Sequence, residues 1–555
     1  MSSERESSPR IFDSAEQWTD LDSAEIVIGL VAPIGTDLSC VADDLIDELK
    51  RVSYQGVLIR LSRQLRELSR PDIKAILEDV LDDGPADIRM AAYMDAGDKF
   101  RELFGKDAVA RLAIGAIMAE RRELVSRAKA AIPIESVTDD RAPAVIAPVD
   151  RFAYVLYQLK RPEEVQCLRE VYGPAFILIA VHTPREQRVR NLAERIAQSH
   201  HEYQKAKYGP HAETLVLRDE ADSQKDVGQN VSDTFHLADV FIDGATPDQR
   251  RMGIHRFVEL LFGNTFYTPT KDEQGMFHAH AASLRSASLG RQVGAVFATE
   301  GGSIVAVGCN EVPKAGGGMY WPRDHGDARD HVLGKDPSDE MKRDVLADIL
   351  KRLNEAGWLE RSRSDRTLSD LMHDALEEGL MNGAHFMNLI EFMRPVHAEM
   401  AALCDAAERG ASLKGATLYV TAFPCHVCAK HIVAVGVDRV VFIEPYPKSL
   451  TVKLYSDSIK LDPPDISSEY VRFVAFVGVA PRRFRDWFMM VNRKDAMGNL
   501  IRWDGAKSRA RLGDWAPMLD ATVFREKLKY NALAVWTGGQ SPSVEETNAA
   551  ERMDG

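Results

Sequence analysis

The chain has 555 residues, 45% hydrophobic and 28% charged, the balance of a folded globular protein. Its length predicts about two to four domains rather than one core. The formal net charge of −14 disfavours a general nucleic-acid binder, although it does not exclude a local basic groove. No apolar run reaches the roughly 18 residues of a membrane span, and the polar first residues do not form a signal peptide. We therefore expect a cytoplasmic protein without a membrane partner.

The first region alternates strand and helix patterns. The expected elements are, in chain order, a strand over 25–31, a helix beginning at Leu38, strands over 154–159 and 175–181, a helix over 184–199 and a strand over 238–243. Such alternation predicts a parallel α/β sheet. Gly244, Thr246 and Pro247 then interrupt the pattern, which sets a first domain at 21–246 between a flexible N-terminus at 1–20 and the next domain.

The second region, 247–535, also reads as βα units around one sheet, and a flexible tail is expected at 536–555. The expected elements are helices over 249–263 and 275–289, a strand pair over 293–298 and 304–308, a helix over 396–409, a strand over 416–421, a helix over 425–435 and a strand over 439–443. The charged, glycine-containing segment 311–394 is expected to be an insertion with helices over 338–356 and 367–378.

One constellation in the second region carries metal chemistry. His397-Ala-Glu399 is followed by Pro424-Cys425-His-Val-Cys428, the H-x-E and P-C-x-x-C pattern of zinc nucleobase deaminases. His397, Cys425 and Cys428 supply three ligands to Zn²⁺ and leave one position for water, whose pKa the metal lowers. Glu399 is close enough in sequence to relay protons without binding the metal.

Each half of the constellation has a simpler reading when taken alone. A single C-x-x-C pair also occurs in structural metal sites and redox pairs, and H-x-E alone has little meaning. Both halves stand at the start of a predicted helix, where the helix dipole stabilises thiolates. Six cysteines are too few for a disulfide scaffold, and the other four are expected to be core residues.

Further motifs surround the zinc residues, at 291–296, 307–313, 417–421, 424–430 and 444–448. Together they resemble the deoxycytidylate deaminase family. In that family the Asn after the second strand contacts the sugar and the substrate, so the resemblance assigns this role to Asn310. It also places Tyr446 near the nucleotide phosphate.

Other motifs extend the resemblance over roughly 24–530; they lie at 29–37, 228–235, 237–241, 318–321, 327–330 and 445–449. The whole chain is similar to bacterial anti-phage dCTP deaminases, in which a P-loop-kinase-like domain precedes a cytidine-deaminase-like α/β/α domain. The resemblance implies conversion of dCTP and dCMP to dUTP and dUMP, and depletion of dCTP during phage infection. It also implies a homo-oligomer, of which a hexamer is one form. In some relatives a small RNA restrains the enzyme, which makes an inhibitory small RNA an expected partner.

A triphosphate substrate needs cations or backbone N–H groups. Arg291, Arg323, Lys430 and Lys448 are near the motifs in sequence and are candidates for this role. A solvated surface charge is an equally good reading of each.

The first region contains a phosphate-loop-like turn at Gly29, Gly35, Thr36 and Asp37. Compared with G-x-x-x-x-G-K-[ST], the glycines are one residue further apart, Thr36 replaces the lysine and Asp37 replaces the Ser/Thr. Backbone N–H groups can still bind phosphate, so nucleotide sensing or a structural role is favoured over a kinase.

Two further groups of side chains in the first region have alternative readings. Asp219, Glu220 and Asp222 are candidates for holding Mg²⁺ with a nucleotide, or lie in a loop. Arg185 and Arg188 resemble kinase lid arginines, although a solvated helix face is preferred.

Three functions remain open at this stage. The preferred one is deamination of free deoxycytidine nucleotides, either in phage defence or as a plain dCMP deaminase of pyrimidine salvage. The second is deamination of tRNA or single-stranded DNA, which the acidic charge and Asn310 disfavour. The third is a regulatory nucleotide- or RNA-binding protein with a structural zinc.

Overall fold

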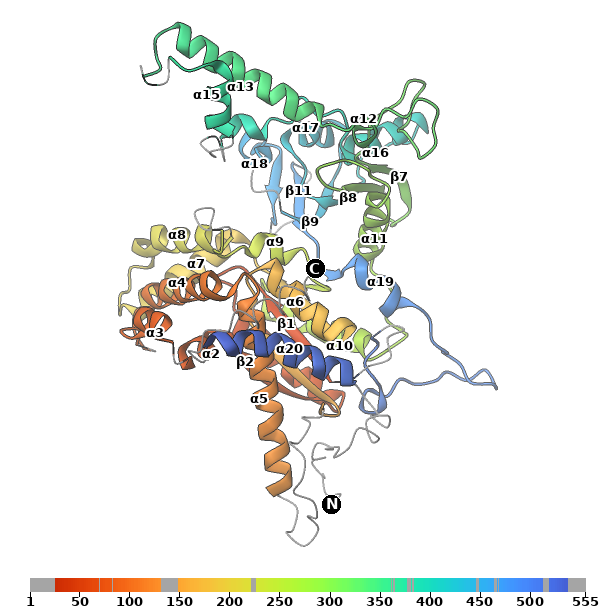
Figure 1. Ribbon diagram of the computed structural model, residues 1–555. Helices are drawn as coiled ribbons and strands as arrows, with labels where there is room; N and C mark the ends of the chain where they lie inside the picture. The colour runs from red at the N-terminus through yellow and green to blue at the C-terminus, as the bar shows by residue number, and fades with distance from the viewer. Residues whose placement is uncertain are drawn as a thin grey trace. The chain divides into compact units, whose positions relative to one another are not determined.

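The computed structural model describes residues 25–68, 70–81, 83–130, 148–220, 226–360, 362, 365–376, 381, 384–445, 449–463, 467, 469–512 and 519–537. The chain divides into two compact units, and each contains one sheet (Figure 1). The first unit comprises 1–273 and 477–555, and the second comprises 274–476. The predicted flexible N-terminus and most of the predicted tail lie outside the described residues.

The sheet of the first unit has the strand order β12-β5-β4-β1-β3-β2. Its first five strands in the chain are mutually parallel, which confirms the predicted α/β class, whereas β12 joins β5 antiparallel. The strands are β1 Ile26–Val31, β2 Gln55–Arg60, β3 Phe152–Tyr157, β4 Phe176–His182, β5 Val240–Asp243 and β12 Gly478–Val479. Sequence patterns identified four of them, and β2 and β12 were missed.

Helices precede and follow these strands. The described α-helices of this unit are α1 Leu38–Arg51, α2 Leu61–Glu67, α3 Pro71–Leu77, α4 Ala86–Phe104, α5 Ala108–Ala130, α6 Pro162–Tyr172, α7 Arg185–Ser199, α8 Gly209–Glu220, α9 Val231–Phe235, α10 Pro247–Leu261, α19 Pro481–Phe488 and α20 Leu519–Thr537. Helix α1 shows why they form where they do. Asp37 caps its first turn, and Leu45 and Leu49 lie buried on its inner face.

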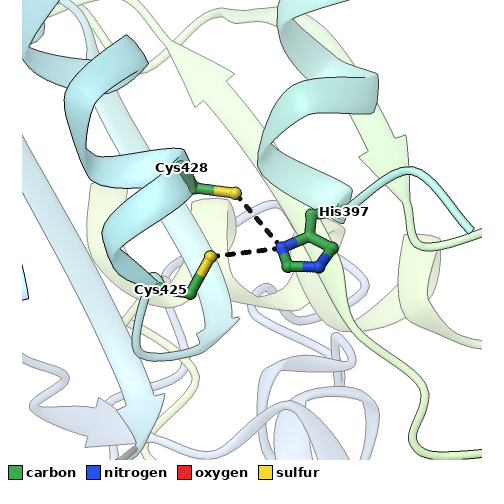
Figure 2. A group of neighbouring side chains, drawn as sticks. All are labelled: His397, Cys425 and Cys428. Atoms are coloured by element: carbon green, nitrogen blue, oxygen red, sulfur yellow. Dashed lines mark hydrogen bonds between the residues drawn. The ribbon is translucent and has the colours of Figure 1, made fainter. Parts of the chain in front are cut away.

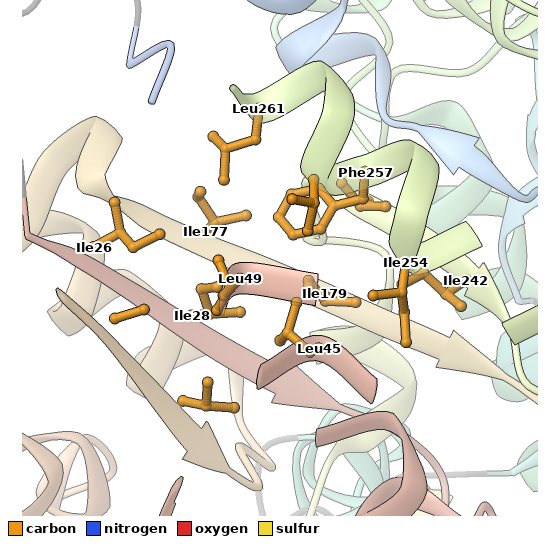
Figure 3. Packing of buried hydrophobic residues seen from close by; sticks show 14 of the residues in the cluster. Ile26, Ile28, Leu45, Leu49, Ile177, Ile179, Ile242, Ile254, Phe257 and Leu261 are labelled. Carbon is orange, nitrogen blue, oxygen red and sulfur yellow. The ribbon is translucent and has the colours of Figure 1, made fainter. Parts of the chain in front are cut away.

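The core of this unit lies between the sheet and two helices, α1 and α10. Figure 3 shows Leu45 of α1 and Phe257 of α10 packed over Ile28 of β1 and Ile179 of β4. All four side chains are 0–1% exposed. The second face of each strand is also apolar, as expected for parallel strands covered on both sides.

The observed division of the chain differs from the predicted boundary at 246/247. Helix α10 follows that boundary but belongs to the first unit, because its apolar residues Ile254, Phe257 and Leu261 complete the first core. The region after 476 returns to the first unit as well, through β12, α19 and α20. The Gly/Pro turn at 244–247 is therefore a turn between β5 and α10 rather than a linker between units.

A buried ion network holds α20 in the first unit. Arg121 of α5, 0% exposed, pairs with Glu526 of α20 at 2.8 Å and with Glu25 at 2.6 Å. Figure 1 shows these two helices, far apart in sequence, side by side. The C-terminal helix is thus part of the fold around the first sheet.

The second unit has a mixed sheet in the order β10-β11-β9-β8-β6-β7. Strand β6 runs antiparallel to its neighbours β7 and β8, and the other pairs are parallel. The strands are β6 Gly294–Ala298, β7 Ile304–Cys309, β8 Thr417–Ala422, β9 Arg439–Glu444, β10 Ile459–Leu461 and β11 Val471–Ala475. The first four agree with the sequence expectation within two residues.

Helices α16 Ala398–Glu408 and α17 His426–Ala434 pack on this sheet and enclose the second core with it. The other described α-helices are α11 Lys271–Ser283, α12 Asp330–Leu333, α13 Pro337–Glu355, α15 Leu368–Leu376 and α18 Thr451–Leu454. Helices α13 and α15 fall where the insertion was expected to be helical. Among the described residues, no helix combines the length and apolar character that crossing a membrane requires.

The six cysteines are all free. Cys167 and Cys309 are core residues as expected, whereas Cys40 is half-buried and Cys404 is exposed. Cys404 differs from the expectation because it lies on the outer side of α16, whose inner side packs with Ala398, Ala402 and Ala406.

Candidate metal centre

Two helix starts bring the predicted metal ligands together. His397 is the N-cap residue of α16, and Cys425 is the N-cap residue of α17, with Cys428 in the first turn of α17. Pro424 directly precedes the N-cap residue Cys425 and lies outside the helix. Because β8 ends at Ala422, the cysteine loop begins directly at the end of a buried strand.

Figure 2 shows the three ligand side chains converging on one point. The Nδ1 atom of His397 lies 3.3 Å from Cys425 Sγ and 3.4 Å from Cys428 Sγ. Tetrahedral Zn²⁺ with its usual bond lengths sets such N···S separations at about 3.5 Å. The donor set and its spacing therefore fit Zn²⁺, with one coordination position left over for a small molecule.

The electrostatics of the centre favour a cation. Hydrogen bonding from Cys428, together with the hydrogen bond and charge of His397, lowers the pKa of the Cys425 thiol well below its usual range despite its burial. Glu399 is 4% exposed and lies in the first turn of α16. Burial raises the pKa of Glu399 to about 7, against the opposing effect of His397. A carboxyl group with this environment can take up and release a proton near neutral pH.

Close packing at Gly308 sets the distance between α16 and the sheet. A Cβ atom on this residue of β7 would lie 2.3 Å from Ala398 O and 2.3 Å from Ala402 N. Only glycine allows the helix backbone to come this near. Because α16 begins at the metal ligand, this contact also positions His397 and Glu399.

Two hydroxyl groups hold the cysteine loop and were missed by sequence reasoning. Ser449 and Thr451 each donate a hydrogen bond to the carbonyl oxygen of Pro424, at 3.1 and 3.0 Å. Thr451 is 0% exposed. No pattern in the sequence connects a carbonyl group to hydroxyls about 25 residues away, so only the fold shows this support.

Asn310, predicted to contact substrate, lies at the end of β7 with its amide turned to the backbone. Its Oδ1 accepts from Val293 N at 2.7 Å, and its Nδ2 donates to Arg291 O at 2.8 Å. The residue is 6% exposed. Its visible role is to hold the segment before β6, and substrate contact by Asn310 stays a prediction.

The predicted phosphate contacts are exposed or outside the described residues. Arg291 pairs with Glu444 at 3.3 Å, and its side chain is 57% exposed. Arg323 and Lys430 are exposed. Tyr446 and Lys448 lie outside the described residues.

Glu311 anchors the insertion beside the metal centre and was also missed. Its carboxylate accepts from Ala287 N and Val312 N at 3.0 and 2.9 Å, and the residue is 1% exposed. Its carbonyl oxygen accepts from Val396 N at 2.9 Å, next to His397. The first residues of the insertion are thus tied directly to the strand-like segment that leads to the metal ligand.

Of the first-unit residues predicted to bind nucleotide, Gly29 and Asp37 have other tasks. Gly29 lies inside β1 rather than in the loop, where a Cβ atom would come within 2.8 Å of Leu159. The Asp37 side chain accepts from Cys40 N and caps α1. Gly35 and Thr36 do lie in the loop, and Gly35 has a φ of +90°.

The described members of the acidic cluster and the lid-like arginines all form ion pairs within the first unit. Arg188 of α7 is 6% exposed and pairs with Glu220 at 2.7 Å. The expectation that it lies on a solvated helix face is therefore wrong. Arg185 pairs with Glu213. Asp219 pairs with Lys160, and Asp222 is outside the described residues. The two described carboxylates of the cluster are therefore committed to cations of the protein, which argues against an open Mg²⁺ site there.

Residues 269–444 match the family model "Cytidine and deoxycytidylate deaminase zinc-binding region". The match covers less than half of the chain and contains the three metal ligands and Glu399. It supports the zinc-binding deaminase region proposed from the motif, and the first unit lies almost entirely outside it.

Individual relatives match over a shorter stretch. The chain is 46% identical over 54 residues to the deoxycytidylate deaminases of Enterobacteria phages T2 and T4, which is 10% of this chain. It is 40% identical over 53 residues to the ComE operon protein 2 of Bacillus subtilis (strain 168). These stretches span only 28–29% of the relatives' own length. The dCMP deaminase of cyanophage S-TIM5, solved with dCMP and dUMP, aligns over 38% of this chain and 98% of its own at 18% identity. Its TM-score of 0.21 is too low to support an inference.

Proposed function

We propose that the protein is a zinc-dependent hydrolytic deaminase that converts dCMP and dCTP into dUMP and dUTP. The convergence of His397, Cys425 and Cys428 on one point, with the buried carboxyl group of Glu399 on the same helix turn, carries this proposal. The deaminase region at 269–444 supports the reaction type, and its deoxycytidylate deaminase relatives support the substrate class.

The chemistry replaces an amino group by oxygen. Zn²⁺ held by the three ligands supplies Lewis-acid activation of a water molecule. Glu399 takes a proton from that water and delivers it to the ring nitrogen N3 of cytosine. The water oxygen forms a bond to C4, and Glu399 then takes the second proton from this oxygen and delivers it to N4. The C4–N4 bond breaks as C4 and the oxygen form a carbonyl group, and ammonia leaves. The products are the uracil nucleotide and ammonia, and no redox partner is needed.

The test is a product assay on the full-length zinc-loaded protein. Ammonia and uracil nucleotides are measured with dCMP, dCTP, CTP, cytidine and a dC-containing oligonucleotide. We expect turnover of dCMP and dCTP that falls by about 100- to 10,000-fold in Glu399→Gln, with zinc content unchanged. Glu408→Gln, an exposed carboxylate on the same helix, is the matched control and should keep full activity.

The alternatives give different outcomes in this assay. Turnover of the oligonucleotide alone would replace the proposal by a nucleic-acid deaminase, and turnover of dCMP without dCTP would reduce it to a deaminase of pyrimidine salvage. Zinc retention without any turnover would favour a structural zinc in a regulatory protein.

The biological setting is proposed with the activity. We propose a cytoplasmic enzyme that depletes dCTP in phage infection, assembles as a homo-oligomer such as a hexamer, and is restrained by a small RNA. The five parallel strands of the first sheet, with a phosphate-loop-like turn between β1 and α1, support a P-loop-kinase-like unit that binds a nucleotide.

A further inference from the structure

A cavity opens in the first unit, far along the chain from the zinc ligands. Its volume is about 250 Å³. The loop after β1 and the residues after β3 form one wall, so the cavity lies at the carboxyl ends of two adjacent parallel strands. Ligands of open α/β sheets bind at this edge. The position alone makes the cavity a candidate binding site.

Two buried polar atoms in its wall lack a partner. Thr36 Oγ1 and Gln229 Oε1 have no hydrogen-bond partner in the part of the chain that the structure describes. Each residue is 7% exposed and lines the cavity. Burying a polar group without a hydrogen bond is unfavourable, so such atoms indicate a ligand that supplies the missing hydrogen bonds. A hydroxyl group can donate to a phosphate oxygen, and an amide oxygen can accept from a sugar hydroxyl or a base.

A lysine from another strand stands beside the loop. The loop has Thr36 where a phosphate loop has its lysine, but Lys160, three residues after β3, also lines the cavity. Asp219, 0% exposed, pairs with Lys160 Nζ at 2.5 Å through one oxygen. Its other oxygen accepts from Ile34 N at 2.7 Å. One buried carboxylate therefore holds both the ammonium group and the loop backbone, which fixes the cation next to the turn.

The opposite wall is apolar. Met90 and Met94 of α4 lie one turn apart, and Leu61 and Leu65 of α2 do the same. Among the described residues that line the cavity, four are cationic and none is acidic. A ligand with a flat, largely apolar part and an anionic part matches these two walls. The volume is near the lower limit of ligand pockets, roughly 300 Å³, which favours one nucleotide over a dinucleotide.

We infer that this cavity is a mononucleotide site in which Lys160 supplies the phosphate-binding cation that the loop itself lacks. The inference rests on the nucleotide-binding role proposed for the first unit, and it is independent of the deamination proposed for the zinc site. The phosphate lies against the turn at Gly35 and Thr36, where the Thr36 hydroxyl group donates to it and the Lys160 ammonium group attracts it. The base lies against the methionines and leucines.

Calorimetric titration of the full-length zinc-loaded protein tests this with ATP, GTP, AMP and GMP, which a cytosine deaminase does not turn over. We expect one-to-one binding of at least one of them, and at least 10-fold weaker binding of adenosine and guanosine. Thr36→Val should weaken nucleotide binding at least 5-fold without lowering the melting temperature, since its hydroxyl group has no partner among the described residues. Thr183→Val removes another buried hydroxyl group that the described part of the chain leaves without a partner. Because Thr183 does not line the cavity, this variant should bind the nucleotide as the wild type does.

A second variant isolates the lysine. Lys160→Met alone would leave Asp219 unpaired, so the double variant Lys160→Met with Asp219→Asn removes both charges together. We expect it to fold and to bind the nucleotide at least 10-fold more weakly. Absence of binding by all four nucleotides would overturn the inference, as would wild-type affinity in either Thr36→Val or the double variant. Glu399→Gln should bind ATP normally, so a failed deaminase assay and a failed nucleotide site are separate results.

Discussion

The metal centre and the first-unit cavity are built in opposite ways. The zinc ligands fall within 397–428, each at the start of a helix, so a short stretch of sequence contains the whole donor set. The cavity draws on Thr36, Lys160 and Gln229, which three separate segments supply. A site whose residues share one motif can be recognised from the sequence, whereas a site assembled by sheet topology can be recognised only once the fold is known.

The largest effect is expected when a ligand of the metal centre is replaced. Cys428→Ser should abolish stoichiometric zinc binding and reduce deamination by more than the roughly 10- to 100-fold typical of changes outside the ligands. Zinc content by mass spectrometry and ammonia release check this. Cys404→Ser changes an exposed thiol on α16 and should have no effect. ATP binding should survive Cys428→Ser if the two sites are separate, and its loss would contradict that separation.

The next effect concerns the long-range framework of the first unit. Arg121→Met leaves Glu25 and Glu526 buried without their cation, which should lower the free energy of unfolding by about 3–5 kcal/mol. Chemical denaturation measures it. Arg122→Met, at the exposed neighbour on the same helix, should change stability by less than about 0.5 kcal/mol. Equal effects of the two variants would show that α20 does not depend on the buried network.

A smaller effect is expected at Gly308, which tests whether the metal centre depends on residues outside its own motif. Gly308→Ala places a Cβ atom against the backbone of α16 and should cost about 1–3 kcal/mol of stability. Because His397 starts that helix, zinc affinity should fall as well, although no ligand is changed. Gly301→Ala, in the loop between β6 and β7, meets only Thr299 Oγ1 at 3.6 Å and serves as the control. Unchanged zinc affinity in Gly308→Ala would mean that the ligands tolerate a displaced helix.

The smallest effect is expected at Thr451. Thr451→Val removes a buried hydrogen bond to Pro424 O and should cost about 1 kcal/mol, with a slight rise in the zinc dissociation constant. Thr451→Ser keeps the hydroxyl group and should behave as the wild type in both measurements. If the serine variant lost as much stability as the valine variant, the methyl group rather than the hydrogen bond would support the loop.

Sequence reasoning succeeded for features that are local in the chain and failed for features that depend on tertiary contacts. The apolar periodicity of β1, α1, β8 and α17 located these elements, since each buries one face or both. Spacing alone predicted one metal site for His397, Cys425 and Cys428, which the structure brings together, and the catalytic role of Glu399 stays a prediction. Strand β2 was missed because its residues are mostly half-buried and show no clear period.

Tertiary contacts decided what sequence patterns could not. The Gly/Pro turn at 244–247 resembles a linker, but the apolar face of α10 packs on the first core. Gly29 resembles a loop glycine, but a strand interior with Leu159 close by accounts for it. Glu311 and Thr451 act through backbone groups distant in sequence, and Lys160 reaches the loop only because β3 lies beside β1.

The return of the chain at β12 has a consequence for biosynthesis. Val479 N donates to Glu273 Oε1, and β12 pairs with β5, so the last strand of the first sheet is synthesised only after the entire second unit. Until then the edge of β5 presents unpaired backbone groups, which are a template for aggregation. A fragment that stops near residue 273 is therefore an unfinished sheet, whereas deleting 274–476 and joining the ends with a short linker would leave the first sheet complete.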